Sequence, residues 1–110
     1  MKRNIFITGA SSGIGKAMAY SFGKNGDNLI LCARRKEKLQ EIKNDIEGRY
    51  DVKVDIYELD VTGYEKVRDT VKEIIKNSEK IDVLINNAGL ALGLEKFQDY
   101  NIADIERMID

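Results

Sequence analysis

Ile5-Phe-Ile-Thr-Gly-Ala-Ser-Ser-Gly-Ile-Gly15 places a short apolar run directly before a glycine-rich turn. From this turn the chain runs into a pattern in which Ile14, Met18 and Phe22 recur every four residues, which indicates a helix. An apolar run, a tight turn and a helix in this order predict the first strand, loop and helix of an α/β unit.

The three glycines of this turn have different expected roles. Gly9 permits the tight turn out of the strand, Gly13 lets backbone approach a ligand without a Cβ in the way, and Gly15 lets helix and strand come close. Free amides and the positive end of the helix dipole would then face a phosphate. The loop therefore predicts a dinucleotide site; the plainer alternative is a flexible turn with Ser11 or Ser12 as the helix N-cap.

Four apolar stretches recur at even intervals along the chain and predict four strands: Ile5–Thr8, Leu29–Ala33, Val52–Val61 and Ile81–Ile85. Three are nearly continuous, as expected of strands covered on both faces. The third alternates apolar and polar residues, which favours an edge strand.

Helical patterns separate these strands. Leu39, Ile42 and Ile46 form one stripe, and Val67, Val71, Ile74 and Ile75 form another after a Thr62–Glu65 capping box. We therefore expect an α/β fold: a Rossmann-type doubly wound parallel sheet, strand order 3-2-1-4, with helices on both faces.

A fourth helical pattern begins at Asn101 and continues through Met108-Ile-Asp110, where there is no glycine cap, no basic last turn and no proline. We expect residues 1–110 to be one nucleotide-binding half-domain, truncated within its fourth helix, and a fragment of a longer single-domain enzyme.

The composition excludes several classes of function. With 18 Lys and Arg against 19 Asp and Glu, the net charge is −1. The sequence therefore gives no sign of a basic face that would bind nucleic acid, and no nucleic-acid partner is expected. The absence of His excludes Ser-His-Asp catalysis and imidazole metal sites, so no metal is expected. One Cys cannot form an internal disulfide, which favours the cytoplasm, and no apolar run is long enough to cross a membrane.

Arg34 and Arg35 follow the second strand, about twenty residues after the glycine loop. An acidic residue there would bind the ribose 2′-hydroxyl of NAD, whereas arginine suits the 2′-phosphate of NADP. We therefore expect NADP, with NAD less favoured. The plainer alternative is a solvated start to the charged helix that follows.

Three segments together resemble the short-chain dehydrogenase/reductase family. Thr8–Gly15 is similar to its Thr-Gly-x-x-x-Gly-x-Gly signature, Leu59-Asp-Val61 stands where its adenine-binding Asp occurs, and Asn86-Asn-Ala-Gly89 matches its turn beside the cofactor. The stretch from Leu29 to Val61 also resembles reductases acting on 3-hydroxy acids and 3-oxoacyl groups. From the residues alone, Asp60 could cap a helix and the two asparagines could be ordinary turn residues.

The resemblance implies NADP(H)-dependent interconversion of a small-molecule carbonyl and a secondary alcohol, and a homo-oligomer in the full-length form. It implies contacts to the pyrophosphate and its ribose, the 2′-phosphate, adenine and the second ribose, in that order, from Gly9, Ser12, Gly13, Ile14, Gly15, Arg34, Arg35, Asp60, Val61, Asn87, Ala88 and Gly89.

No catalytic residue is expected within the chain. The family's Ser and Tyr-x-x-x-Lys lie after the Asn-Asn-Ala-Gly turn, so we expect the 110 residues alone to be inactive. Tyr20-Ser-Phe-Gly-Lys24 has the right spacing, but Tyr20 lies several ångström down the first helix from the phosphate end, packed at its rim, with Lys24 solvated. The alternative function is a non-catalytic nucleotide-binding or regulatory module; a sugar-nucleotide epimerase is disfavoured by Asn86–Gly89.

Overall fold

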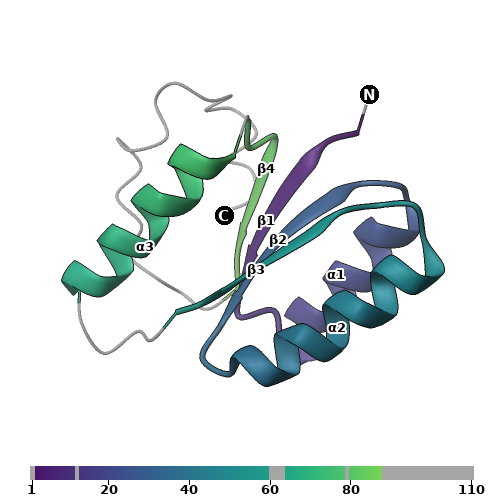
Figure 1. The fold of residues 1–110 in the computed structure, drawn as a ribbon, viewed down its shortest axis with the longest axis horizontal. Coiled ribbons are helices and arrows are strands. Elements are labelled where there is room, and N and C mark those ends of the chain that lie inside the picture. The colour runs from purple at the N-terminus through teal and green to yellow at the C-terminus, as the bar shows by residue number, and fades with distance from the viewer. Residues whose placement is uncertain (1, 12, 60–63, 79, 88–110) are drawn as a thin grey trace.

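Four short strands form one parallel sheet in a computed structural model of the chain, which describes residues 2–11, 13–59, 64–78 and 80–87 (Figure 1). The order β3-β2-β1-β4 confirms the predicted topology, with helices following the first three strands. The elements are β1 (Asn4–Thr8), α1 (Gly13–Lys24), β2 (Asn28–Ala33), α2 (Lys36–Arg49), β3 (Val54–Glu58), α3 (Tyr64–Asn77) and β4 (Val83–Asn86).

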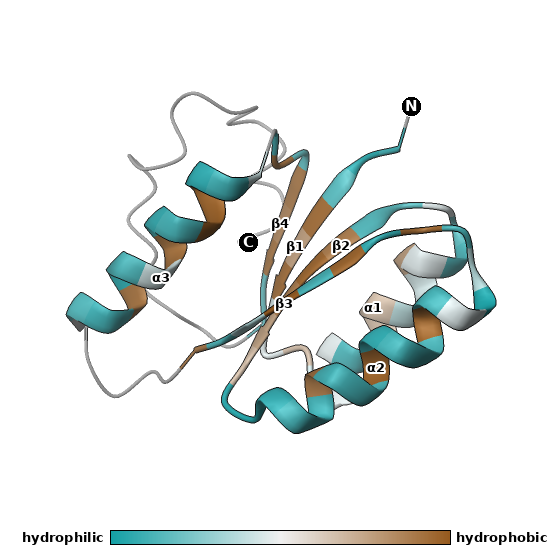
Figure 2. Cartoon of the chain, viewed as in Figure 1, coloured by the Kyte–Doolittle hydropathy of each residue, from teal (hydrophilic) through white to brown (hydrophobic). Residues whose placement is uncertain are grey.

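Alternate side chains of the strands feed two separate hydrophobic cores. Ile5 and Ile7 of β1 point to the side covered by α1 and α2, whereas Phe6 between them packs with α3 on the other side. All three are fully buried, which explains why the strand reads as a continuous apolar run. Figure 2 shows the same division, with hydrophobic ribbon on the strands and on the sheet-facing side of α3.

The buried face of α1 differs from the stripe that marks the helix in the sequence. The residues that face the sheet are Gly15, Ala19 and Gly23, while Met18 and Phe22 are only partly buried. Small residues let the helix axis approach the strands, so the large side chains flank the contact. Ile14 is 67 % exposed.

β1 and β2 each begin one residue before the predicted stretch, whereas β3 and β4 are shorter than predicted. β3 covers only Val54–Glu58 of the predicted stretch, and β4 begins at Val83 although Ile81 before it is fully buried. Within the described residues β3 lies at one edge of the sheet, as its alternating pattern predicts. The Thr62 capping box and the helix expected from Asn101 lie outside the described residues.

Two side chains of α2 bind the first residue of this edge strand. The Glu47 carboxylate accepts a hydrogen bond from the backbone N–H of Val54 at 2.9 Å, and the Lys43 ammonium donates to the Val54 carbonyl. Lys43 and Glu47 are themselves 3.0 Å apart. The hydrogen bond from Val54 and the Lys43 charge outweigh partial burial and lower the pKa of Glu47. This arrangement, the α2–β3 clamp, fixes where β3 begins against the helix.

A buried carboxylate holds the amino ends of β1 and β2 together. Asp27 has only 5 % of its side chain exposed and accepts two hydrogen bonds of 3.0 Å from Arg3. Asn25 donates a third at 3.1 Å. Burial raises the pKa of Asp27, but the hydrogen bonds from Arg3 and Asn25 outweigh it, so the net shift is downward. The carboxylate therefore stabilises the fold while it is ionised.

We predict that Asp27→Asn lowers the free energy of unfolding at pH 7 by about 1–2 kcal/mol, because Arg3 loses a charged partner that is only partly screened. Since the folded pKa is depressed, the contribution is complete above the unfolded pKa of about 3.9 and is lost as pH falls through the lower folded value. Urea unfolding from pH 7 to pH 2 measures it: the difference between wild type and variant should vanish at the acid end.

The matched control is Asp51→Asn, because Asp51 is exposed. It should leave stability at pH 7 unchanged. A difference between wild type and Asp27→Asn that stays constant down to pH 2 would contradict the assigned role of the Asp27 charge.

Candidate cofactor-binding site

The glycine loop lies at the carboxyl edge of the sheet, where the chain order reverses. β1 is flanked by β2 on one side and by β4 on the other, and the connections leave toward opposite faces. Ligands of open parallel sheets bind at such a reversal. Gly9 and Gly13 have φ angles of 64° and 57°, a left-handed backbone that favours glycine; this agrees with the turn predicted at Gly9, while the ligand approach predicted at Gly13 stays a prediction.

Position 15 requires glycine because the neighbouring backbone leaves no space for a Cβ. A Cβ at this position would lie 2.2 Å from the carbonyl oxygen of Gly9 and 2.8 Å from Nδ2 of Asn87. The first turn of α1 therefore rests directly on the loop backbone, as the sequence predicts for the third glycine.

The Gly9 carbonyl oxygen is also held from β4. The side-chain amide of Asn87 donates to it at 3.0 Å. One residue earlier on each strand, the Thr8 hydroxyl lies 3.1 Å from Oδ1 of Asn86 and 3.4 Å from the carbonyl of Ile85. Asn87 therefore bridges the end of β4 and the glycine loop, and side chains fix the loop to β4.

The other side of the loop is fixed to β2. The backbone N–H of Ala10, which is fully buried, donates to the carbonyl of Cys32 at 3.0 Å. Ser11 therefore emerges beside the carboxyl end of β2, where Arg34 and Arg35 follow. Both arginines are exposed, and Arg35 occupies the N-cap position of α2 without a side-chain capping bond. The structure thus brings the loop and two guanidinium groups to one edge.

Five of the predicted contact residues lie outside the described residues: Ser12, Asp60, Val61, Ala88 and Gly89. The backbone leading to two of them is described, because the N–H of Leu59 donates to the Ala33 carbonyl at 2.8 Å. This bond carries the end of β3 to the same edge as the glycine loop.

Tyr20 is committed to a structural contact. Its hydroxyl donates to Oδ2 of Asp45 at 2.6 Å, so it links α1 to α2 and packs against the core. The Asp45 hydrogen bond, reinforced by burial, raises the pKa of Tyr20. Lys24 is exposed one turn further along the helix. A tyrosine that must transfer a proton needs the opposite pKa shift and a position at the cofactor.

A cavity of about 290 Å³ lies between α1 and α2, and we call it the α1–α2 groove. Its polar lining comes from Ser11, Lys16, Tyr20, Lys38, Glu41 and Asp45. The sequence does not single out Lys38 as a lining residue, because in a charged helix its spacing resembles that of any solvated lysine. The available signal is its place in the first turn after Arg34 and Arg35.

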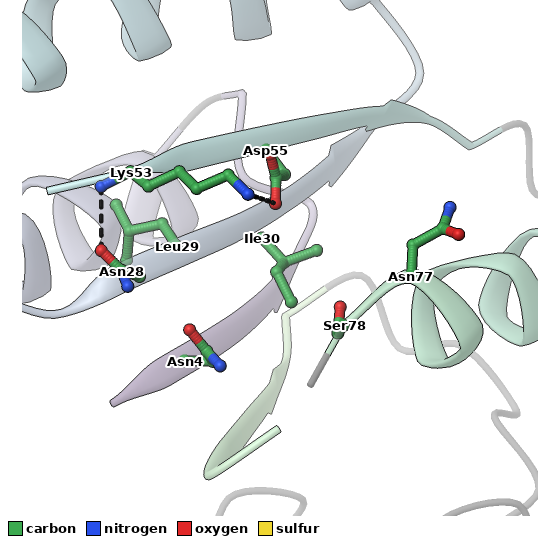
Figure 3. A pocket seen from close by; sticks show the side chains of 8 residues that line it. All are labelled: Asn4, Asn28, Leu29, Ile30, Lys53, Asp55, Asn77 and Ser78. Carbon is green, nitrogen blue, oxygen red and sulfur yellow. Dashed lines mark hydrogen bonds and ion pairs between the residues drawn. The ribbon is translucent and has the colours of Figure 1, made fainter. Parts of the chain in front are cut away.

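A second cavity, of about 320 Å³, lies at the opposite, amino end of the strands. Its lining includes Asn4 and Asn28 at the starts of two strands and Asn77 and Ser78 at the end of α3, all labelled in Figure 3. Lys53 and Asp55, also in the lining, form an ion pair of 3.7 Å. Because parallel strands place their ligands at the carboxyl edge, this cavity is not part of the glycine-loop site.

The remaining chemistry of the described residues is sparse. Burial raises the pKa of the Cys32 thiol, which leaves it an unreactive core residue. Residues 2–11, 13–59, 64–78 and 80–87 contain no group of His, Cys, Asp and Glu that could hold a metal ion. No helix in this part of the chain has the length and apolarity to cross a membrane.

Comparison with known proteins supports the family that the sequence motifs resemble. Residues 3–110 match the family model described as short chain dehydrogenase, and the chain belongs to the short-chain dehydrogenase/reductase family. It is 45 % identical over 108 residues to the NADP-dependent 3-hydroxy acid dehydrogenase of Schizosaccharomyces pombe, covering 97 % of this chain. It is 37 % identical over 106 residues to the NADP-dependent 3-hydroxy acid dehydrogenase YdfG of Salmonella typhi, covering 96 % of this chain.

Solved structures share the fold. An alcohol dehydrogenase from the archaeon Thermococcus sibiricus, complexed with 5-hydroxy-NADP, superimposes with a TM-score of 0.73 at 32 % identity over 77 % of this chain and 36 % of its own. The chain spans 42 % of the length of the S. pombe enzyme and 41 % of the S. typhi enzyme.

We predict that Gly15→Ala destabilises the fold by about 1–3 kcal/mol, because the new methyl group overlaps the Gly9 carbonyl and the loop must move. Thermal unfolding measures the loss. The same displacement should break the hydrogen bond that the Asn87 side-chain amide donates to the Gly9 carbonyl, which a shift of the Asn87 side-chain amide signals in an NMR spectrum would detect.

Gly48→Ala is the matched control. A Cβ at Gly48 meets nothing within 4 Å, and the residue lies in α2, so alanine should stabilise the helix by about 0.5 kcal/mol. Equal melting temperatures for the two variants would show that the close approach at Gly15 is not tight.

Proposed function

We propose that this chain is the cofactor-binding part of an NADP(H)-dependent oxidoreductase that interconverts a carbonyl and a secondary alcohol. The observation that carries the proposal is the glycine loop, whose Gly9 carbonyl is fixed by Asn87 and packed against Gly15 at the reversal of the sheet. A loop fixed in this way presents its amides and the start of α1 to a phosphate without further ordering.

The proposed contacts follow the position of each residue. Gly9, Ser12, Gly13, Ile14 and Gly15 would bind the pyrophosphate and its ribose, and Arg34 and Arg35 the 2′-phosphate. Asp60 and Val61 would lie at adenine, and Asn87, Ala88 and Gly89 along the second ribose. The exposure of Ile14 supports this assignment, because a large apolar side chain at the start of α1 is free to cover a ligand.

Two exposed guanidinium groups at the end of β2 support the choice of NADP over NAD. Arginine binds phosphate with paired hydrogen bonds, and no acidic residue at this position competes for the ribose hydroxyl. The S. pombe and S. typhi relatives, both named as NADP-dependent 3-hydroxy acid dehydrogenases, agree with this choice.

The cofactor, when bound, supplies or accepts the hydride. The described residues of this chain would bind and orient it, and Tyr20, whose hydroxyl is bonded to Asp45, is not positioned to transfer a proton at the cofactor. The 3-hydroxy acids of the relatives' names make 3-oxo acids and their esters the first substrates to test.

We predict that the chain binds NADP⁺ at least about tenfold more tightly than NAD⁺, since a phosphate–guanidinium interaction contributes about 1.5–3 kcal/mol. Arg34→Asp should remove most of this preference through repulsion of the 2′-phosphate. Isothermal titration calorimetry with both nucleotides measures the ratio of Kd values.

Lys72→Asp is the control for net charge, because it makes the same change on the exposed side of α3. It should leave the ratio of Kd values unaltered. A wild-type ratio near one, or a preference that survives Arg34→Asp, would contradict the assignment of the 2′-phosphate to these arginines.

A fourth prediction concerns turnover. The 110-residue chain should bind NADPH but oxidise it no faster than background with 3-oxo esters and simple ketones, because general acid-base catalysis alone is worth about 10²–10⁴-fold. The assay follows NADPH absorbance. Turnover that Tyr20→Phe abolishes would overturn the structural role given to Tyr20; protection of residues 9–15 by NADP⁺ without turnover is the expected result.

A further inference from the structure

We propose that the α1–α2 groove extends the 2′-phosphate site, with Lys16 and Lys38 as phosphate-binding residues and Glu41 as the residue that limits their effect. The proposal rests on the proposed function, since it names two further determinants of the choice between NADP and NAD. Both lysines belong to helices, whereas the contacts proposed above come mainly from the glycine loop and from the residues after β2.

The upper end of the groove, formed by Ser11 and the first turns of α1 and α2, lies beside the predicted phosphate position. Ser11 lines the groove, and it directly follows Ala10, whose N–H is bonded to the last-but-one residue of β2, Cys32. Lys38 lies in the first turn of α2, three residues after Arg35. A phosphate held between Ser11 and the end of β2 therefore has the groove, with Lys16 on one wall and Lys38 on the other, beside it.

The charges at this end are available to a ligand. Lys16 and Lys38 are exposed, and within the described part of the chain neither forms a hydrogen bond or an ion pair with another side chain. The structure therefore holds two ammonium groups beside a hydroxyl at one opening. A phosphate dianion is the ligand that this set of donors suits.

The lower end of the groove is already neutralised and closed. Asp45 accepts a hydrogen bond from Tyr20 at 2.6 Å and pairs with Arg49 at 2.9 Å, and the Tyr20 and Arg49 hydrogen bonds lower its pKa. Asp45 therefore has its own hydrogen-bonding partners, and the Lys16 charge makes only a smaller contribution to lowering its pKa.

Glu41 is the remaining acid of the lining, and it is exposed without an ion pair among the described residues. Its place on α2, one turn below Lys38, puts a negative charge between the closed end and the opening. It attracts the lysines and repels the phosphate. Substitution of a lysine and substitution of Glu41 should consequently shift phosphate binding in opposite directions.

The test uses two probes that differ only by the phosphate of interest: adenosine 2′,5′-bisphosphate and adenosine 5′-monophosphate. The Kd of the monophosphate divided by the Kd of the bisphosphate, both measured by calorimetry on the 110-residue chain, reports the contribution of the 2′-phosphate. Lys16→Gln and Lys38→Gln should each reduce this ratio by about threefold to tenfold, and Glu41→Gln should increase it by about twofold to threefold. All three changes should shrink in 0.5 M salt.

Lys24→Gln is the matched control, because Lys24 is exposed at the far end of α1 and lines a different cavity. It should leave the ratio unchanged. A wild-type ratio near one would overturn the proposed cofactor choice and this inference together. A wild-type preference for the bisphosphate that both lysine variants retain, or that Lys24→Gln reduces equally, overturns the role of the groove alone and leaves the cofactor choice intact.

Discussion

The structure depends on one carbonyl oxygen. The Gly9 carbonyl is covered on one side by the backbone of Gly15, where no Cβ fits, and is bonded on the other to the Asn87 amide. Through this atom the end of β1, the start of α1 and the end of β4 share one fixed position. Segments nearly eighty residues apart in the sequence are thereby held in one geometry without a ligand, as the proposed pyrophosphate contact requires.

The interior on both faces of the sheet is largely apolar, and the one buried carboxylate of the described residues, Asp27, lies at the amino end beside Arg3. Exposed cations lie at both ends of the strands: Lys2 and Lys53 at the amino end, and Arg34, Arg35 and Lys38 at the carboxyl end. At the carboxyl end they follow β2 beside the glycine loop, where the proposed cofactor would bring its phosphates, although the chain as a whole has a net charge of −1.

The sequence allowed the strand order and the glycine geometry to be predicted, because both follow from local patterns: continuous apolar strands, and glycines at fixed offsets from a helix start. It did not reveal which face of α1 is buried, since Gly15, Ala19 and Gly23 leave a weaker hydrophobic signal than Met18 and Phe22 beside them. Nor did it reveal the α1–α2 groove. Tyr20 and Asp45 are twenty-five residues apart, and only the packing of two helices brings them together.

The α2–β3 clamp has a consequence for how this sheet behaves toward other chains. The backbone carbonyl of Lys53 and the backbone N–H of Leu59 bond to β2. By alternation along the strand, the backbone N–H and carbonyl groups of Val54, Ile56 and Glu58 point toward the open edge of the sheet. Glu47 and Lys43 occupy both groups of Val54, and a charged side chain stands at Glu58. A strand from another molecule would therefore find the backbone groups of Val54 already bonded and a charged side chain at Glu58, which protects the molecule from edge-to-edge aggregation.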